Sequence, residues 1–204
     1  MLKLIEGSNN KKFNGLIETG YRLFMQYGIK RITINEICQA AKVSRVTFYK
    51  YFNNKIELLK SIIESIANRQ LNAYKQIMEQ KVTFPEKVQQ IIRLKNDYTI
   101  MMSQDFFNDL WNSKEQEIID LLIEAKKNSF QAVLNDFKTA QKNGDIRQDI
   151  NLNFILFFLE HLTELAKDEN LIKLYHSPNE LIVELTNFFF YGILPRQKMG
   201  GKHR

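Results

Sequence analysis

The sequence predicts an all-α fold in two parts, a three-helix N-terminal domain containing a helix-turn-helix and a larger helical C-terminal domain. Apolar residues recur at the three- and four-residue spacing of helices along most of the chain. Only 3 prolines and 8 glycines occur in 204 residues, which favours long uninterrupted helices. No segment requires a β-strand.

The first helix is expected at about 13–27. Its apolar stripe runs to Tyr27, and Gly28 is the residue type that commonly follows a helix end. Gly20 lies inside this helix, where a glycine costs about 1 kcal/mol relative to alanine. We therefore expect a second helix to pass close to Gly20.

The second helix is predicted to begin after Thr33. Thr33 can cap it, and Glu36 three residues later completes a capping box that satisfies free backbone N–H groups. Its inward face is marked at helical spacing by Ile34, Ile37, Cys38 and Ala41. Because Cys38 is the single cysteine and lies on this face, we interpret it as a small buried hydrophobic residue.

The third helix is predicted to follow a tight turn at residues 42–43. Ser44 is a good N-cap, and Phe48 and Phe52 lie four residues apart on an inward face. The outward faces carry Arg45, Val46, Thr47, Tyr49 and Lys50. A short, basic, hydroxyl-rich helix held by an aromatic inner face suits the major groove of DNA.

The positive charge of the chain is concentrated in the same segment. Residues 1–60 contain 11 basic and 4 acidic side chains, a net charge of +7, whereas the remainder carries −1 and the whole chain +6. A surface that neutralises phosphates needs such local excess, because release of counterions supplies most non-specific affinity. On its own the charge also fits an ordinary solvated face, but together with the motif it supports DNA binding.

The segment VSRVTFYKYFNNKIELL resembles the recognition-helix signature of the TetR family of bacterial transcriptional regulators. The resemblance extends back through LIETGYRLFMQYGIKRITINEICQAA and covers roughly residues 13–60. The positions that agree with the family pattern are Phe24, Gly28, Thr33, Ile37, Ala41, Val43, Ser44, Thr47, Tyr49, Phe52, Lys55 and Leu58. The resemblance implies a DNA-binding regulator with a helical C-terminal domain whose last two long helices pair with those of a second subunit.

Two positions depart from the family pattern. Lys42 stands in the helix-helix turn where the family usually has glycine, so we expect Lys42 to adopt an unfavourable positive φ. Val46 stands where the family often has glycine, and it offers an apolar surface that suits a thymine methyl group.

The predicted DNA contacts form two groups. The residues expected at base edges or adjacent phosphates are Arg45, Val46, Thr47 and Lys50. Those expected to hold the DNA backbone and set the register are Thr33, Ser44, Tyr49, Tyr51 and Lys55, and Lys42 in the turn completes the set. One short helix reads only a few base pairs, so we expect a homodimer on a double-stranded operator with two half-sites.

The rest of the chain is predicted to be helical from residue 54 onward, and the domain boundary is expected at 60/61, giving domains of 1–60 and 61–204. After the helix that begins at Asn54, further helices are expected at 83–102, 103–111, 113–142, 152–169 and from 177 to 191 or 194.

The last two long helices have more apolar surface than one inner stripe uses. The residues predicted to form a four-helix dimer interface are Phe157, Phe158, Leu162, Leu165, Leu185, Phe188, Phe189 and Ile193. The alternative is a thick monomer core.

A pocket for a small hydrophobic ligand is predicted in the middle of the C-terminal domain, where several helices should converge. The expected lining residues are Tyr98, Met101, Met102, Phe106, Phe107, Trp111, Phe130 and His161. Aromatic residues on helices also form ordinary cores, which is the alternative for each of them.

No pattern in the sequence favours catalysis. His161, His176 and His203 lie at no metal-ligand or dyad spacing, and no glycine-rich phosphate loop occurs. We therefore expect no enzyme activity, no cofactor and no metal. No apolar run reaches the roughly 20 residues that span a membrane, so we expect a cytoplasmic protein.

The function predicted from these features is that of a homodimeric transcriptional repressor released from DNA by a small hydrophobic ligand. The alternatives are an activator without a small-molecule effector, or an adaptor that binds other proteins through the aromatic C-terminal faces. The adaptor leaves the basic N-terminal face unexplained.

Overall fold

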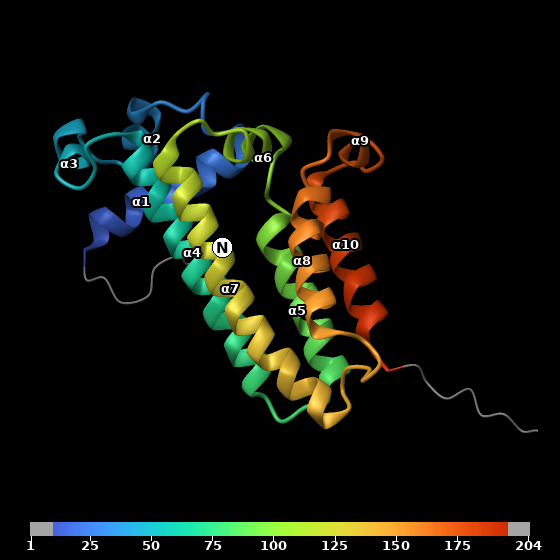
Figure 1. Ribbon diagram of the computed structural model, residues 1–204. Coiled ribbons are helices and arrows are strands. Elements are labelled where there is room, and N and C mark those ends of the chain that lie inside the picture. Colours follow the sequence, from blue (N-terminus) through green and yellow to red (C-terminus); the bar gives the residue numbers. More distant parts are fainter. Residues whose placement is uncertain (1–9, 196–204) are drawn as a thin grey trace, which may run out of the picture.

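The computed structural model describes residues 10–195, which form ten α-helices and, over that range, no strand (Figure 1). The predicted all-α class is confirmed. The helices are α1 (Lys11–Tyr27), α2 (Ile34–Ala40), α3 (Arg45–Tyr49), α4 (Lys55–Glu79), α5 (Phe84–Thr99), α6 (Gln104–Trp111), α7 (Gln116–Asn143), α8 (Leu152–Leu165), α9 (Glu169–Ile172) and α10 (Pro178–Ile193). No helix in this range has the length and apolar character that crossing a membrane requires.

Local signals set the ends of the first three helices. Gly28 follows α1 at φ 82°, and its N–H donates to the carbonyl of Phe24. Thr33 and Glu36 form the predicted capping box at the start of α2. Lys42 has φ 55°, which confirms the strain expected where the family pattern has glycine.

The N-terminal helices pack around one aromatic and aliphatic core. Phe24 and Phe48 are fully buried and Phe52 is 3% exposed, as their predicted inward positions require. The ring of Phe13 stacks on that of Phe52, with 5.4 Å between centroids. This core also takes Phe106 and Leu110 from α6, so it extends beyond the N-terminal segment of the chain.

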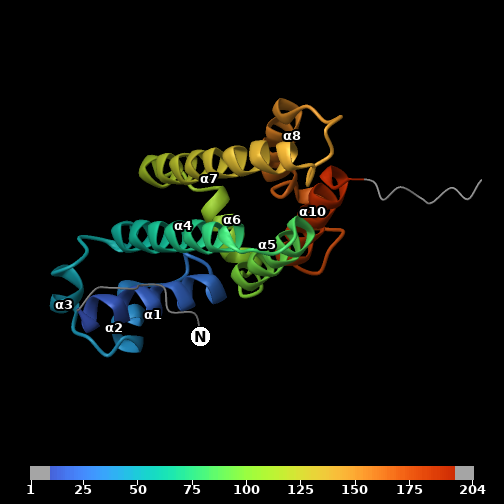
Figure 2. The ribbon, with the colours of Figure 1, turned by 90° about the horizontal axis from the view of Figure 1, so that it is seen from below.

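Helix α4 passes against α1 and continues into the C-terminal part (Figure 2). A Cβ at Gly20 would stand 3.0 Å from the Cδ1 of Ile62 and from the Cδ2 of Leu58, both on α4. This confirms the expected close helix, because a side chain at residue 20 would have to displace the ends of Ile62 and Leu58. A rigid helix thus connects the two parts without a loose linker.

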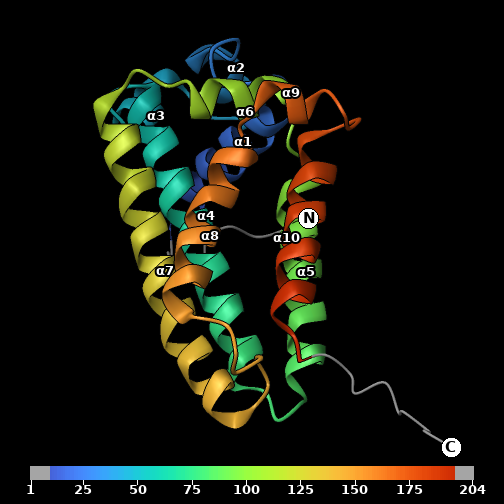
Figure 3. The same cartoon turned by 45° about the vertical axis from the view of Figure 1, so that its right-hand side comes forward.

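The C-terminal helices surround a second core (Figure 3). Helix α5 packs on α10, and α7 packs on both α4 and α8. The ring of Phe137 from α7 lies at its centre, stacked on Phe189 at 6.0 Å and edge-on to Phe84 at 6.4 Å.

Three predicted boundaries were wrong. Helix α5 ends at Thr99, not at 102, so residues 100–102 form a connection. Helix α8 ends at Leu165, and the short α9 follows because the carboxylate of Asp168 caps the N–H groups of Asn170 and Leu171. Helix α7 begins at Gln116, after a short connection whose Ser113 hydroxyl accepts from the N–H of Glu115.

Candidate functional site

The outward face of α3 is formed by the residues predicted to meet DNA. Val46 is 69% and Tyr49 46% exposed, unusually high values for large apolar or aromatic side chains. Arg45 and Lys50 are also exposed, and Lys42 is exposed in the preceding turn. Because Phe48 anchors the opposite face, α3 presents these side chains from a fixed base.

The two N-cap residues use their hydroxyl groups inside the motif. The Ser44 hydroxyl accepts from the N–H of Thr47 at 3.1 Å and lies 3.0 Å from the Thr47 hydroxyl. Thr33 donates to the carboxylate of Glu36 from its N–H and its hydroxyl, each at 2.7 Å. These bonds lower the pKa of Glu36, with the hydroxyl bond making the larger contribution. Thr33 and Ser44 therefore fix the starts of α2 and α3. Both side chains are also exposed.

The ammonium of Lys55, predicted to contact the DNA backbone, instead points into the protein. It donates to the carbonyls of Ile29 at 2.8 Å, Lys30 at 3.3 Å and Ile32 at 2.8 Å. An ammonium has three donors, so these bonds occupy all of them. Burial lowers the pKa of Lys55, and the carboxylates of Asp109 and Glu36 oppose that effect. We therefore correct the prediction for Lys55: it holds the α1–α2 connection and not a phosphate.

Tyr51 joins the motif to the start of α1. Its hydroxyl exchanges hydrogen bonds with the amide of Asn10, at 2.8 and 3.0 Å, and its ring lies edge-on to Phe13 at 5.7 Å. The side chain is only partly buried, so it remains at the edge of the α3 surface while fixing the N-terminus of α1.

The similarity of this chain to known proteins agrees with a helix-turn-helix at its N-terminus. The family model described as "Bacterial regulatory proteins, tetR family" matches residues 16–62, which span α1 to the first turns of α4. The N-terminal part of the chain is thus a tetR-family DNA-binding segment. The chain is therefore a DNA-binding helix-turn-helix transcriptional regulator, and the family is not one of enzymes.

Relatives of this regulator cover most of its length at low identity. The "Probable acrEF/envCD operon repressor" of Escherichia coli (strain K12) is 23% identical over 226 residues, covering 90% of this chain and all of the relative. The fatty acid degradation regulator FadR from Bacillus halodurans is 15% identical with a TM-score of 0.69, covering 97% of this chain and 100% of that one.

A regulator from Saccharomonospora viridis solved in complex with choline is 18% identical with a TM-score of 0.72, covering 90% of this chain and 98% of that one. At such identities the structural likeness establishes the fold alone.

The residues predicted to line a ligand pocket do not converge. Met101 is 60% exposed, because α5 ends before it, and Trp111 is 37% exposed beneath the ammonium of Lys167. His161 is exposed on α8, where its Nδ1 lies 2.8 Å from the carbonyl oxygen of Phe157. The prediction of one common lining is therefore wrong for these three.

The other five predicted lining residues are at least partly buried, but in different places. Phe106 belongs to the N-terminal core, against which Met102 also packs. Phe107 is buried edge-on to Trp111, and Phe130 is partly exposed with the Lys126 ammonium 5.5 Å from its ring. Tyr98 lies beside two polar side chains from other helices, Arg69 on α4 and Tyr21 on α1, which sequence reasoning missed.

The predicted dimer residues also divide into two sets. Phe157 and Phe188 are 59% and 69% exposed and Leu165 is 39% exposed, whereas Phe158, Leu162 and Leu185 are partly buried. Phe189 and Ile193 are each 3% exposed in the second core, so their assignment to the interface was wrong. They lie on the side of α10 that faces inward, and the exposed stripes instead include Phe154 at 55% and Tyr191 at 63%.

A hollow of about 460 Å³ lies beside these exposed rings, where the start of α8 meets the end of α10. Phe154 and Phe188 line it, together with the guanidinium-bearing Arg147 from the α7–α8 connection. It opens on the same surface as the exposed aromatic stripes.

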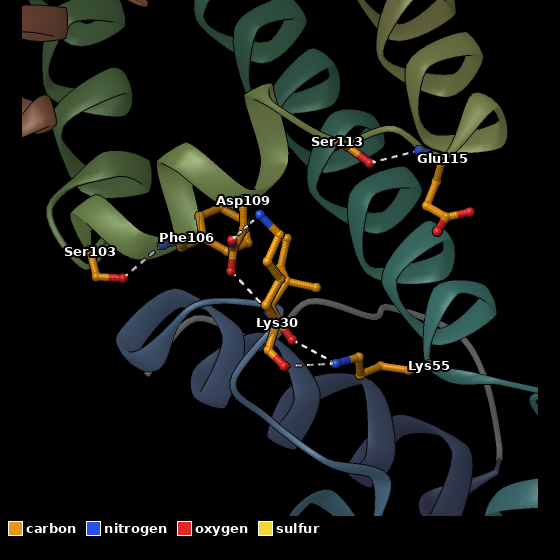
Figure 4. A network of polar contacts seen from close by, with 8 residues as sticks. Lys30, Lys55, Ser103, Phe106, Asp109, Ser113 and Glu115 are labelled. Carbon is orange, nitrogen blue, oxygen red and sulfur yellow. Dashed lines mark hydrogen bonds and ion pairs between the residues drawn. The ribbon is translucent and has the colours of Figure 1, made fainter. Parts of the chain in front are cut away.

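Helix α6 rests on the α1–α2 connection (Figure 4). The carboxylate of Asp109 accepts from the N–H of Lys30 at 2.8 Å and pairs with its ammonium at 3.2 Å. The N–H of Ser103 donates to the carbonyl of Met25 at 2.9 Å. A Cβ at Gly28 would stand 2.9 Å from the Cβ of Asp105, so glycine allows α6 to approach. The motif is thus fastened to the C-terminal part through both α4 and α6.

Proposed function

We propose that this regulator is a homodimeric repressor that binds a two-fold symmetric operator in double-stranded DNA and is released by a small hydrophobic ligand. Residues 1–60 would read DNA, and residues 61–204 would bind the ligand and the second subunit. The observation that carries the proposal is the exposed basic face of α3 on a buried aromatic base. The name of the Escherichia coli relative supports repression. A protein acting on bacterial DNA would work in the cytoplasm.

The roles of the residues on the outward face of α3 follow from how exposed each side chain is. Arg45, Val46 and Lys50 stand outward to reach base edges and adjacent phosphates, and Thr47 is partly exposed beside them. Tyr49 and Lys42 flank them and would contact the backbone, where a hydroxyl or ammonium positions the protein without reading sequence.

The second subunit would cover the outer faces of α8 and α10. Phe157 lies three residues after Phe154 and Leu165 eight residues after Phe157, both spacings that keep one face of α8, and Phe188 and Tyr191 lie three residues apart on α10. Five large apolar side chains exposed on one surface are uncommon in a monomer. A two-fold axis through this surface would bury them, and the dimer would present two α3 helices to the two half-sites of one operator.

Ligand binding would reach α3 through the two connections to the motif. Helix α5 leads directly into α6, and α6 holds the α1–α2 connection by the Asp109–Lys30 pair. The Asp109 side chain is only 13% exposed and also accepts from the backbone N–H of Lys30, whereas the Lys30 side chain is 75% exposed, so the bond to the N–H is the better shielded of the two contacts. A shift of α5 would therefore move α6 and α4 together and change the separation of the two α3 helices. The ligand needs only a preference of a few kcal/mol for one arrangement.

The test is selection of bound sequences from random duplex DNA, followed by anisotropy titration of the selected site. We expect a two-fold symmetric site and an affinity that falls steeply with salt. Arg45→Ala should cost about 1–3 kcal/mol at the selected site and relax base preference, as is typical of a lost base contact. Tyr49→Ala should weaken binding to all sequences by a similar factor.

The matched control is Arg93→Ala, which removes an exposed arginine from α5 and should leave DNA affinity unchanged. Absence of duplex binding, or an affinity that does not respond to salt, would overturn the proposal and favour the adaptor alternative.

A further inference from the structure

The start of α1 lies beside the end of α3 (Figure 1 and Figure 2). The hydroxyl of Tyr51 and the side-chain amide of Asn10 exchange two hydrogen bonds, at 2.8 and 3.0 Å. The ring of Phe13 lies edge-on to that of Tyr51 at 5.7 Å and stacks on that of Phe52 at 5.4 Å. Polar and aromatic contacts thus join two segments whose bonded residues are 41 positions apart in the sequence.

Lys11 and Lys12 are the first two residues of α1. They directly follow Asn10, so their Cα atoms lie within about 8 Å of the Cα of Asn10. Both side chains are exposed, and neither ammonium has a hydrogen bond or an ion pair among residues 10–195. Two ammonium groups are therefore available to a ligand beside the C-terminal end of α3.

The segments that meet here carry positive charge and no carboxylate. Residues 10–17 and 37–56 contain no Asp or Glu. The exposed cations of these two ranges are Lys11, Lys12, Lys42, Arg45 and Lys50. The start of α1 and the outward face of α3 therefore form one positively charged surface, in which no acidic side chain of either segment competes with a phosphate for these cations.

The length of α3 makes the residues beyond its ends important for DNA binding. Its 5 residues span about 7.5 Å, whereas the major groove of B-DNA is about 12 Å wide. A helix this short that reads base edges leaves the phosphates bordering the groove to residues beyond its two ends. Lys42 lies before the N-terminal end, and Lys11 and Lys12 lie beside the C-terminal end. Exposed cations are thus present at both ends.

We propose that Lys11 and Lys12 bind the DNA phosphates that flank each half-site, and that the Asn10–Tyr51 pair holds the start of α1 in place for this contact. Tyr51 is then a positioning residue, because its single hydroxyl proton is donated to Asn10 and a phosphate accepts only from donors. This inference rests on the proposed function and extends the DNA-contacting surface from α3 to α1.

The test is an anisotropy titration of the full chain with its selected duplex over a series of salt concentrations. The double variant Lys11→Met with Lys12→Met should bind roughly ten-fold or more weakly at about 0.1 M salt. Each phosphate contact adds about 0.9 to the slope of log K against log salt, so losing two contacts in each of two subunits should lower the slope by about 3–4. Base preference should not change, because phosphate contacts carry no sequence information.

Two further double variants are controls. Lys75→Met with Lys81→Met also removes two exposed lysines, at the end of α4 and in the connection after it. Lys75 lies 20 residues along α4 from Lys55, which is about 30 Å and well beyond the roughly 10 Å screening length at 0.1 M salt. Affinity and slope should therefore not change. Lys11→Arg with Lys12→Arg keeps both charges and should also retain the affinity and the slope.

Tyr51→Phe tests the positioning role. It removes the hydroxyl and keeps the ring that packs on Phe13. We expect DNA binding to weaken several-fold in the otherwise unmodified protein and to show no further change when Lys11 and Lys12 are already methionine. An equal loss in both backgrounds would show that the hydroxyl acts on DNA directly, and no loss in either would show that it positions nothing, so both results contradict the positioning role.

The phosphate contact itself is overturned if the double methionine variant keeps the affinity and the salt dependence of the unmodified protein. It is also overturned if the variant at residues 75 and 81 loses as much affinity, because the effect is then one of net charge. Either result leaves the proposed function standing, since the unmodified protein still binds its operator. Absence of duplex binding by the unmodified protein would instead contradict the proposed function.

Discussion

The two parts of this regulator bury their aromatic residues differently. Phe24, Phe48 and Phe52 of the N-terminal helices are each at most 3% exposed. On α8 and α10, Phe157 and Phe188 are more than half exposed. The N-terminal part therefore completes its core within one chain, whereas the C-terminal part leaves a surface that a second subunit would complete.

The same contrast holds for inward-facing cations. The Lys55 ammonium has three carbonyl partners, so the polar network of the motif is closed. Arg69 retains a buried Nη1 atom that has no hydrogen-bond partner among residues 10–195. A closed network suits a rigid DNA-reading unit, and an open one suits a part whose stability and shape respond to a ligand.

The largest expected effect compares one aromatic residue from each part. Phe48→Ala should lower the free energy of unfolding by about 3–5 kcal/mol, because it leaves a cavity under α3. Phe188→Ala should leave the stability of the isolated subunit nearly unchanged, since Phe188 is 69% exposed there. Urea unfolding at low protein concentration measures the first effect.

Light scattering measures what Phe188→Ala does instead. The unmodified protein should have twice the 24.2 kDa of one chain at micromolar concentration, and Phe188→Ala should shift the mass toward one chain. A single-chain mass for the unmodified protein would show that the exposed stripes do not pair. Equal losses of subunit stability in the two variants would remove the contrast between the two parts.

A smaller effect concerns the strained turn of the N-terminal part. Lys42 has φ 55°, a conformation that costs a non-glycine residue roughly 1 kcal/mol. Lys42→Gly should therefore raise the free energy of unfolding by roughly 0.5 kcal/mol, after the greater freedom of glycine in the unfolded chain is subtracted. Lys50→Gly, at a position with ordinary φ, is the comparison and should destabilise. A loss of stability in Lys42→Gly would mean that its side chain contributes more than its strain costs.

The smallest effect is on pH dependence and compares two capping boxes. Hydrogen bonds from Thr33 and from Thr83 lower the pKa of Glu36 and of Glu86, respectively. A lowered pKa in the folded state means that each carboxylate stabilises the fold above the unfolded pKa of glutamate, and that this contribution is lost as pH falls through the folded value. Glu36→Gln and Glu86→Gln should each flatten part of the acid limb of the stability curve.

The box at Glu36 should matter more, because α2 has 7 residues and α5 has 16. Melting temperatures measured from neutral to acid pH, with Gln26→Glu as a charge control on an exposed face of α1, test this order. A larger change for Glu86→Gln would contradict it.

Local signals explain which features could be predicted from the sequence. The caps at Thr33, Ser44 and Ser177 act within four residues of chain, so the helix starts that they specify were predicted correctly. Two residues in unusual positions also gave correct predictions. Gly20 inside a helix predicted the close approach of α4, and Lys42 in place of a turn glycine predicted a positive φ. The split between α8 and α9 was missed, although Asp168 is a capping residue, because the apolar pattern continues across it.

Faces that depend on distant partners could not be predicted. Periodicity places Phe188 and Phe189 on adjacent faces of α10, but only the positions of α7 and α8, whose Phe137 and Phe158 rings stack on Phe189, decide that Phe189 is inside. Lys55 agrees with the family pattern, and its direction depends on carbonyls more than 20 residues earlier in the chain.

By itself, the sequence determined the helical class, the capped helix-turn-helix and the concentration of positive charge around it, because these follow from short-range spacing and composition. The tertiary structure alone decided which aromatic faces remain exposed and where the Lys55 ammonium points. Those features depend on how helices pack, and packing joins residues whose separation along the chain carries no local signal.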